Sequence, residues 1–416
     1  MTLTTAPETP TTGAPRLARS PGTWLRRNLF RSRADSATTV VVGALAVYLL
    51  FRLVQFVFVT GRWDVIRVNL KLLMVGRFPD VHLPRVAISL VIAAAVIGLV
   101  AGVVNRRQLA AGTSTHATMS VVARLTDLVE RFWPVLLGAG LVLGLTSTPG
   151  PSLTVAGAIA AGFVGRIVGG ALPKQAHPVV VVAALVTPFL LTWYLADAIG
   201  WDGWGGLMLN VFMAVVSLIL CFPLGVLAAL GRRSNLPIVR AISTGFIELF
   251  RGAPLFVLLL MANVALGFFL PEGTSPSTVV RAIVVFTLFT AAYVAEVVRG
   301  GLQSLPSGQT EAGRALGLSP VRITFLIVLP QALRNVIPAL VGQFISLFKD
   351  TTLAGAAMGL FELFRVTEAI TQQGAFAGQG LVAETFMFAG LLFWIGSYTM
   401  SRESQRIESK LGVGTR

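Results

Sequence analysis

The chain has 416 residues, of which 55% are hydrophobic and only 12% are charged. A soluble protein carries about a quarter charged residues, so this composition excludes an ordinary soluble globular protein. Apolar runs recur along the whole chain, and most approach the roughly 20 residues that a helix needs to cross a bilayer. These features indicate an all-α polytopic membrane protein.

The formal net charge is +15, from 33 Lys and Arg residues against 18 Asp and Glu residues. The basic residues lie in short loops beside apolar runs, where they orient membrane spans, and form no clustered face of a nucleic-acid-binding module. A single cysteine, Cys221, excludes a disulfide framework within the chain, and the three histidines are far apart. The sequence therefore predicts no nucleic-acid partner, no metal site and no cofactor bound directly to this chain.

The N-terminal residues 1–38 are rich in Thr, Pro and Arg, and they predict a disordered cytoplasmic tail rather than a signal peptide. About ten transmembrane helices follow, and we expect them at 39–59, 86–104, 133–148, 152–172, 178–197, 207–230, 240–270, 278–298, 332–360 and 384–402. The spans divide into an N-terminal region, 39–204, and a C-terminal region, 205–404. Residues 405–416 form a second cytoplasmic tail.

The distribution of Lys and Arg predicts that both termini are cytoplasmic, because most basic loops then fall on that side of the membrane. The opposite loops 197–206 and 271–277 contain neither residue. The loop 60–85 is an exception, since its five basic residues fall on the predicted outer side. An amphipathic helix lying in the membrane interface at 63–74 would account for it.

The fourth predicted span carries small residues at a strict four-residue spacing: Gly157, Ala161, Gly165 and Gly169. Residues four apart lie on one face of a helix, and small residues there let two helix backbones approach closely in a membrane. The stripe predicts close packing of this span against a neighbouring helix.

The stretch 296–330 is a polar insert between apolar spans, and its sequence predicts two short helices. Ser307 can cap a first helix that runs to about Leu316, and Gly317 can end that helix in a left-handed turn. Ser319 and the following proline can start the second helix.

The first of these short helices has features of a docking element. Ala312, Ala315 and Leu316 fall on one of its faces. Glu311 lies in its first turn, where the helix dipole favours a negative charge. A short helix that is small on one side can lie in a groove of a partner protein outside the bilayer.

This insert closely resembles the EAA loop of ABC-transporter permease subunits. In that family the pattern is Glu-Ala-Ala, three residues, Gly, nine residues and Ile-x-Leu-Pro, and the spacing from Glu311 to Pro330 matches at every step. One residue departs, because Gly313 replaces the second Ala; the change loosens the helix by about 1 kcal/mol without adding bulk. The resemblance implies that the following residues couple the chain to an ATPase: Glu311, Ala312, Gly313, Leu316 and Gly317.

Further segments resemble permeases of the polar amino acid family, namely 248–255, 293–309 and 348–353. The segment 231–237 and the additional N-terminal region are most similar to the general L-amino acid transport system. By this resemblance, 205–404 is a five-helix type I ABC importer core with a cytoplasmic EAA loop at 300–331. The region 39–204 is then an additional transmembrane region.

The resemblance implies a permease subunit of an ATP-driven importer of polar or general L-amino acids in the inner (plasma) membrane. The chain lacks Gly-x-x-x-x-Gly-Lys-Ser/Thr, so ATP and Mg²⁺ belong to a separate ATPase and this subunit is not an enzyme. Further implied partners are an extracytoplasmic amino-acid-binding protein and a second permease, either homologous or a second copy. The binding protein largely sets which amino acids are carried.

Two other classes of function are considered. An ion-coupled secondary amino acid transporter would act without an ATPase, and it predicts two matching halves with paired central acids. The two halves of this chain do not resemble each other. A membrane scaffold would leave the matched segments as coincidence.

Ionisable side chains inside spans are candidates for the translocation path, because burying them in hydrocarbon is unfavourable. They are Glu248, Glu296, Lys349 and Asp350, and polar residues in core spans add Asn210, Asn263 and Gln343. Each charged group can instead form a structural ion pair, and each amide an interhelical hydrogen bond.

Overall fold

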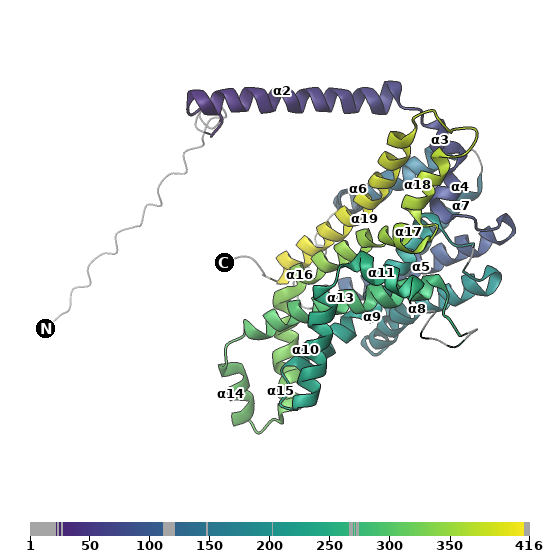
Figure 1. The fold of residues 1–416 in the computed structure, drawn as a ribbon. Helices are drawn as coiled ribbons and strands as arrows, with labels where there is room; N and C mark the ends of the chain where they lie inside the picture. Colours follow the sequence, from purple (N-terminus) through teal and green to yellow (C-terminus); the bar gives the residue numbers. More distant parts are fainter. Residues whose placement is uncertain are drawn as a thin grey trace. The chain divides into compact units, whose positions relative to one another are not determined.

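The fold is taken from a computed structural model (Figure 1), which describes residues 22–411 except 23–24, 26–27, 111–120, 147–148, 202, 266–268, 270 and 272–273. Most of the predicted tail 1–38 and the end of the second tail, 405–416, lie outside the described residues. The chain divides into two compact units, Met1–Arg62 and Trp63–Arg416, which we describe separately.

In the described residues of the first unit, one helix is long and apolar enough to cross a membrane. Helix α2 (Arg33–Gln55) continues into a π-helical turn (Phe56–Thr60), and together they form an apolar span. The Ser32 hydroxyl accepts a hydrogen bond from the Asp35 N–H at 3.0 Å and caps the helix. The helix therefore begins inside the predicted tail, six residues before residue 39.

Among the described residues of the second unit, every regular element is a helix, and Gly206 and Glu362 form one isolated bridge. Its helices are α3 (Asp64–Val68), α4 (Leu70–Val75), α5 (Leu83–Ala110), α6 (Val121–Leu145), α7 (Pro149–Ala171), α8 (His177–Ile199), α9 (Gly206–Arg232), α10 (Pro237–Gly252), α11 (Leu255–Val264), α13 (Thr278–Gln303), α14 (Gly308–Ala315), α15 (Pro320–Ile323), α16 (Leu329–Asp350), α17 (Leu353–Met358), α18 (Leu363–Thr371) and α19 (Val382–Leu411). The predicted all-α class is confirmed.

Within the described residues, 7 helices are long and apolar enough to cross a membrane, or up to 8 if a bent pair counts as one span. The sequence predicts about ten. The predicted span 133–148 corresponds to a shorter apolar helix, Phe132–Leu145, and 384–402 lies in α19, which is long enough but not among the seven. The fold is that of a polytopic helical membrane protein, with a smaller number of clear spans.

The predicted span 240–270 is wrong as one continuous helix. It consists of α10 and α11, whose axes differ by 101°. Ala253 between them is extended, with φ −96° and ψ 137°. Pro254 explains the break, because a proline disfavours helical backbone at the preceding residue and has no N–H to donate. The predicted span 332–360 is also too long, since α16 ends at Asp350.

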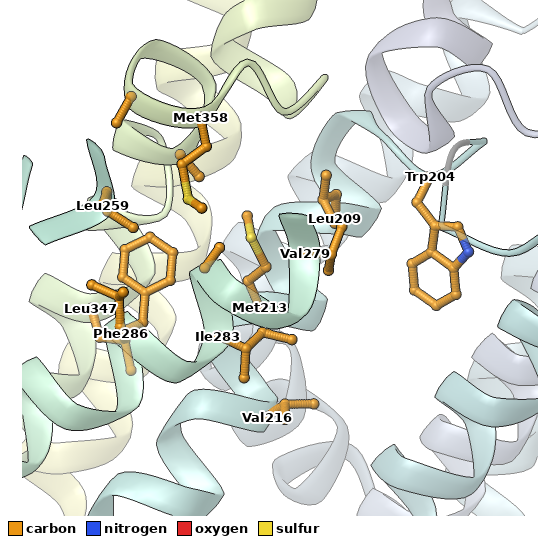
Figure 2. Packing of buried hydrophobic residues seen from close by; sticks show 14 of the residues in the cluster. Trp204, Leu209, Met213, Val216, Leu259, Val279, Ile283, Phe286, Leu347 and Met358 are labelled. Carbon is orange, nitrogen blue, oxygen red and sulfur yellow. The ribbon is translucent and has the colours of Figure 1, made fainter. Parts of the chain in front are cut away.

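The centre of the second unit is α13, which packs against α9, α10, α11 and α16. One buried cluster joins Met213 of α9, Phe286 of α13 and Met358 of α17. In Figure 2 the ring of Phe286 lies beside Leu259 and Leu347. This packing holds the C-terminal helices together as one body, from which the connector α14–α15 extends (Figure 1).

The basic segment 60–85 does not form the single interfacial helix that the sequence suggests. It folds into α3 and α4, which bury Val65, Ile66 and Leu73 in one cluster with residues of α18 and α19. The basic side chains Arg67 and Lys71 remain exposed. The apolar half of the segment is therefore covered by protein, which explains its amphipathic pattern.

The predicted close packing of the glycine stripe is confirmed, and its partner is α5. A Cβ atom added at Gly165 would collide with the carbonyl oxygen of Ala95, and one at Gly169 would collide with that of Leu99. At Gly157 the nearest atom would be Val91 Cγ2, at an ordinary 3.5 Å. Two glycines of the stripe thus allow direct contact between the α5 and α7 backbones.

Candidate coupling surface and transport path

Helix α14 ends as the sequence predicts. Gly317 has φ +72°, its N–H donates to the Arg314 carbonyl at 2.9 Å, and the Leu318 N–H donates to the Gly313 carbonyl at 3.1 Å. These two bonds are the pair that closes a Schellman motif, and the positive φ requires glycine. The Ser319 hydroxyl accepts from the Arg322 N–H at 3.4 Å and starts α15, also as predicted.

The predicted capping by the Ser307 side chain is wrong. Ser307 occupies the N-cap position, but its backbone is helical, with φ −59° and ψ −28°, and its hydroxyl makes no cap hydrogen bond. The Ser307 carbonyl accepts from the Thr310 and Glu311 N–H groups instead. A side chain can cap a helix when the backbone of the N-cap residue is extended, and in the tight turn after Pro306 the backbone of Ser307 is not extended.

The predicted docking face of α14 is exposed. Glu311, Ala312 and Ala315 are exposed, and Leu316 has 78% of its surface accessible. On α15, Val321 is 66% accessible. Large apolar side chains exposed on a polar connector are typical of a protein-binding surface.

Gly313 is buried on the opposite side of α14. A Cβ added there would lie 2.9 Å from Ile323 Cγ1, so the missing methyl group lets α14 lie closely on α15. The departure from the EAA pattern therefore coincides with tight packing inside the connector. A cavity of about 350 Å³ beside α14 is lined by Glu311 and Arg314 together with Arg233, which follows α9.

At the same end of the bundle, five charged side chains join α9, α10 and α13. Arg232 pairs with Glu248 at 2.9 Å and with Glu296 at 3.5 Å. Glu296 also pairs with Arg251 at 3.6 Å and with Arg299 one turn along α13. Glu248 and Glu296, two candidates for the translocation path, are thus held in ion pairs. This is the structural role that the sequence left open as the alternative. Their contact with a substrate stays a prediction.

Asn210 is fully buried and connects elements that are far apart in the sequence. Its Nδ2 donates to Thr351 Oγ1 at 3.0 Å and to Glu362 Oε2 at 3.1 Å, and its Oδ1 accepts from the Leu363 N–H at 2.9 Å. These bonds fix the start of α9 against the start of α18. The side chain has the interhelical role that the sequence offered as the alternative to lining the path.

Glu362 is a buried acid that the sequence reasoning missed. Its carboxylate caps α18 by accepting from the Phe364 and Arg365 N–H groups at 2.8 Å each. It lies just outside the predicted span 332–360, so the search for acids inside spans passed over it. Its place in the apolar run Gly-Leu-Phe-Glu-Leu-Phe was the available signal.

Burial raises the pKa of the Glu362 carboxyl from its ordinary value of 4.5 to about 7. The three hydrogen bonds that the carboxylate accepts lower its pKa, but their effect is smaller than that of burial. The folded chain therefore keeps a proton that the unfolded chain has already released between about pH 4.5 and 7. We expect thermal stability in detergent to fall across this window, by up to about 3 kcal/mol, and to level off above it. Glu362→Gln should remove this slope, whereas Glu368→Gln, a change at a more exposed acid of α18, should keep most of it, because the charge of Glu368 is the smallest of the effects on the pKa of Glu362. An unchanged slope in Glu362→Gln would contradict the assignment.

The remaining path candidates lie on α11 and α16. Asn263 is half-buried, and its backbone carbonyl accepts from Arg281 at 2.9 Å. Gln343 and Asp350 are half-buried, and Lys349 is exposed. Within the described part of the chain, the ion pairs of Glu248 and Glu296 join them to arginines and to none of these residues; the two acids lie on α10 and near the C-terminal end of α13.

Helix α16 also has an exposed face that the sequence reasoning did not single out. Its members recur every three or four residues, so they share one side of the helix: Asn335, Ala339, Gly342, Ser346 and Lys349. Gln343 and Asp350 lie beside this face. Small and polar residues are unusual on a lipid-facing side, which favours contact with protein or water.

The helices define a polytopic membrane protein with an exposed polar connector, α14–α15, between α13 and α16. Residues 221–407 match the family of binding-protein-dependent transport system inner membrane components. The probable glutamine ABC transporter permease protein GlnP of Bacillus subtilis is 34% identical over 206 residues, which cover 49% of this chain and 91% of the relative. The chain belongs to this family of transporter permeases, and it is a multi-pass inner membrane protein.

Two further relatives are more similar over the matched segment. The inner membrane amino-acid ABC transporter permease protein YhdY of Escherichia coli K12 is 44% identical over 56% of this chain and 64% of its own length. The glutamate/glutamine/aspartate/asparagine transport system permease protein BztC of Rhodobacter capsulatus is 44% identical over 50% of this chain and 48% of its own. The chain therefore spans about half to two thirds of the length of these relatives.

Proposed function

We propose that the chain is the transmembrane permease subunit of an ATP-driven ABC importer for polar or general L-amino acids. The exposed face of α14 carries this proposal, because the helix has the predicted EAA spacing, the left-handed end at Gly317 and an accessible Leu316. The names of the relatives, which include amino-acid, glutamine and glutamate systems, support the substrate class.

A separate ATPase supplies the energy in this proposal. The sequence contains no phosphate-binding loop, so ATP and Mg²⁺ bind to the partner. In this proposal the partner binds Glu311, Ala312, Leu316 and the turn at Gly317. Buried Gly313 allows α14 to pack closely against α15. Closure of the ATPase pushes α14, and the adjacent ion pairs of Arg232 pass the movement to α9, α10 and α13.

In the same proposal α14 and both termini are cytoplasmic, in agreement with the distribution of Lys and Arg. Helix α9 has 27 residues, so its two ends are about 40 Å apart. Arg232 at one end lies near the connector, and Gly206 at the other end contacts Phe361 before α18. The end that carries α18 is then extracytoplasmic and receives the amino-acid-binding protein.

The exposed face of α16 favours a second permease as a partner, either homologous or a second copy. Asn335, Ser346 and Lys349 on one helix would be unfavourable against lipid, whereas a facing permease or a water-filled path between the two would accept them. Gln343 and Asp350, beside this face, then border the path.

A co-purification experiment tests the proposal against the ion-coupled alternative. We expect the full chain, co-expressed with the ATPase and the secreted solute receptor encoded nearest to it, to retain the ATPase through purification. Proteoliposomes should then take up amino acid only with ATP inside the compartment that the ATPase faces. Uptake by the chain alone, driven by an ion gradient, would contradict the proposal.

A further inference from the structure

A second cavity lies at the end of the bundle opposite to α14. It has a volume of about 750 Å³, in the range of small-molecule sites, and most of its lining comes from α18, the start of α19 and the turn before α18. The lining includes Arg77, Phe361, Arg365, Glu368, Gln372 and Phe386. Charged, polar and aromatic groups therefore meet in one open pocket.

Arg77 is the lining residue that comes from outside the matched segment 221–407. It follows Gly76, whose φ of +68° and close approach to Gly205 leave no room for a side chain. Helix α4 before it is buried against α18 through Leu73. The backbone at Arg77 is therefore held in place, and its guanidinium stacks 4.4 Å above the ring of Phe361.

The pocket is lined by charged groups of both signs, which a zwitterion needs. Arg365 pairs with Glu368 at 2.8 Å, so part of its donor capacity is used. Among the described residues, no carboxylate lies within ion-pair distance of Arg77. Two cations against one anion leave the pocket with a net positive charge. A carboxylate can bind Arg77 through two parallel hydrogen bonds, and an ammonium group can bind Glu368.

We propose that this pocket binds an α-amino acid on the extracytoplasmic side, with its carboxylate on Arg77 and its ammonium group on Glu368. The proposal rests on the proposed function, which supplies the orientation and the substrate class. The proposal gives the region before α5 a direct part in transport, because Arg77 lies in that region and outside the matched segment 221–407.

The test uses the full chain in nanodiscs without ATPase, with radiolabelled L-glutamate as the probe. Glutarate serves as a second probe, because it has both carboxylates of glutamate and no ammonium group. We expect Arg77→Gln to weaken binding of both probes about tenfold or more. Arg67→Gln removes the same charge from the same segment outside the pocket, and it should change affinity by less than about twofold.

Glu368→Gln separates the two contacts. Glutamate should bind about tenfold more weakly, whereas glutarate should bind unchanged or more tightly, because Arg365 loses its partner. If Arg77→Gln lowers the folded yield, Arg77→Lys keeps the charge and should retain affinity to within about tenfold. Equal effects of Arg77→Gln and Arg67→Gln, or equal effects of Glu368→Gln on both probes, would overturn the proposal.

An acidic side chain of the binding protein could occupy Arg77 in place of the amino acid. In that case Arg77→Gln would leave glutamate binding unchanged and would lower stimulation of the ATPase by the binding protein, which overturns the present proposal. The two proposals fail separately. If the natural chain binds neither probe although the ATPase still attaches and is stimulated, the pocket proposal alone is defeated. An ATPase that never attaches to the chain defeats the proposed function.

Discussion

Glu311→Lys is expected to abolish coupling to the ATPase while the chain still inserts and folds. Glu311 is exposed in the first turn of α14 and lines a cavity with Arg233 and Arg314. Lysine there would oppose the helix dipole at a cost of only about 0.3–1 kcal/mol, too little to unfold the chain. A reversed charge in an interface costs several kcal/mol, so we expect ATPase stimulation in proteoliposomes to fall by about a hundredfold or more.

The matched control for this prediction is Glu311→Gln, which keeps the shape of the side chain and removes only its charge. Its effect should lie between those of the natural residue and lysine. Thermal melting of both variants in detergent should stay close to that of the natural chain. Uptake and ATPase stimulation that persist in Glu311→Lys would show that α14 is not the docking helix.

The connector could be predicted from sequence almost to the residue, because local chemistry determines it. A left-handed turn after a helix strongly favours glycine, and a Ser-Pro pair is a strong helix start. Gly317 therefore identified the end of α14, and Ser319 identified the start of α15. The predicted capping by Ser307 was wrong because side-chain capping needs an extended backbone at the N-cap residue. The backbone there depends on how the chain turns at Pro306 after the end of α13.

The buried polar network could not be predicted, because it depends on contacts between distant segments. Asn210 and Glu362 are 152 positions apart and meet only when α9 and α18 pack. Hydropathy locates each polar residue but gives no partner. The same limit explains the segment 60–85, whose amphipathic pattern fits either a membrane interface or a protein groove.

The broken span could have been predicted and was not. Apolar composition continues through 240–270, and reading length alone gives one long helix. Pro254 is a local signal that the helix ends near Gly252, and the structure bends there by 101°. Composition predicts that a segment is buried in the membrane, whereas single residues such as Pro254 decide how the backbone runs within it.

The packing of α5 on α7 predicts opposite effects for the same substitution at two positions of one stripe. Gly165→Ala should destabilise the chain by about 1–3 kcal/mol, because the new methyl group would overlap the Ala95 carbonyl and force the helices apart. Gly157→Ala should be neutral or stabilising by up to about 1 kcal/mol, because alanine is the better helix former and the nearest side-chain atom leaves room.

Thermal unfolding in detergent and protease accessibility of the α7–α8 connection measure both variants. Adding Gly169→Ala to Gly165→Ala should increase the loss further, since Gly169 contacts the Leu99 backbone in the same way. The comparison is internal, because helix propensity changes equally at positions 157 and 165 and only the neighbouring backbone differs. Equal melting temperatures for Gly157→Ala and Gly165→Ala would mean that the α5 and α7 backbones are not in direct contact, and that the glycine stripe has another cause.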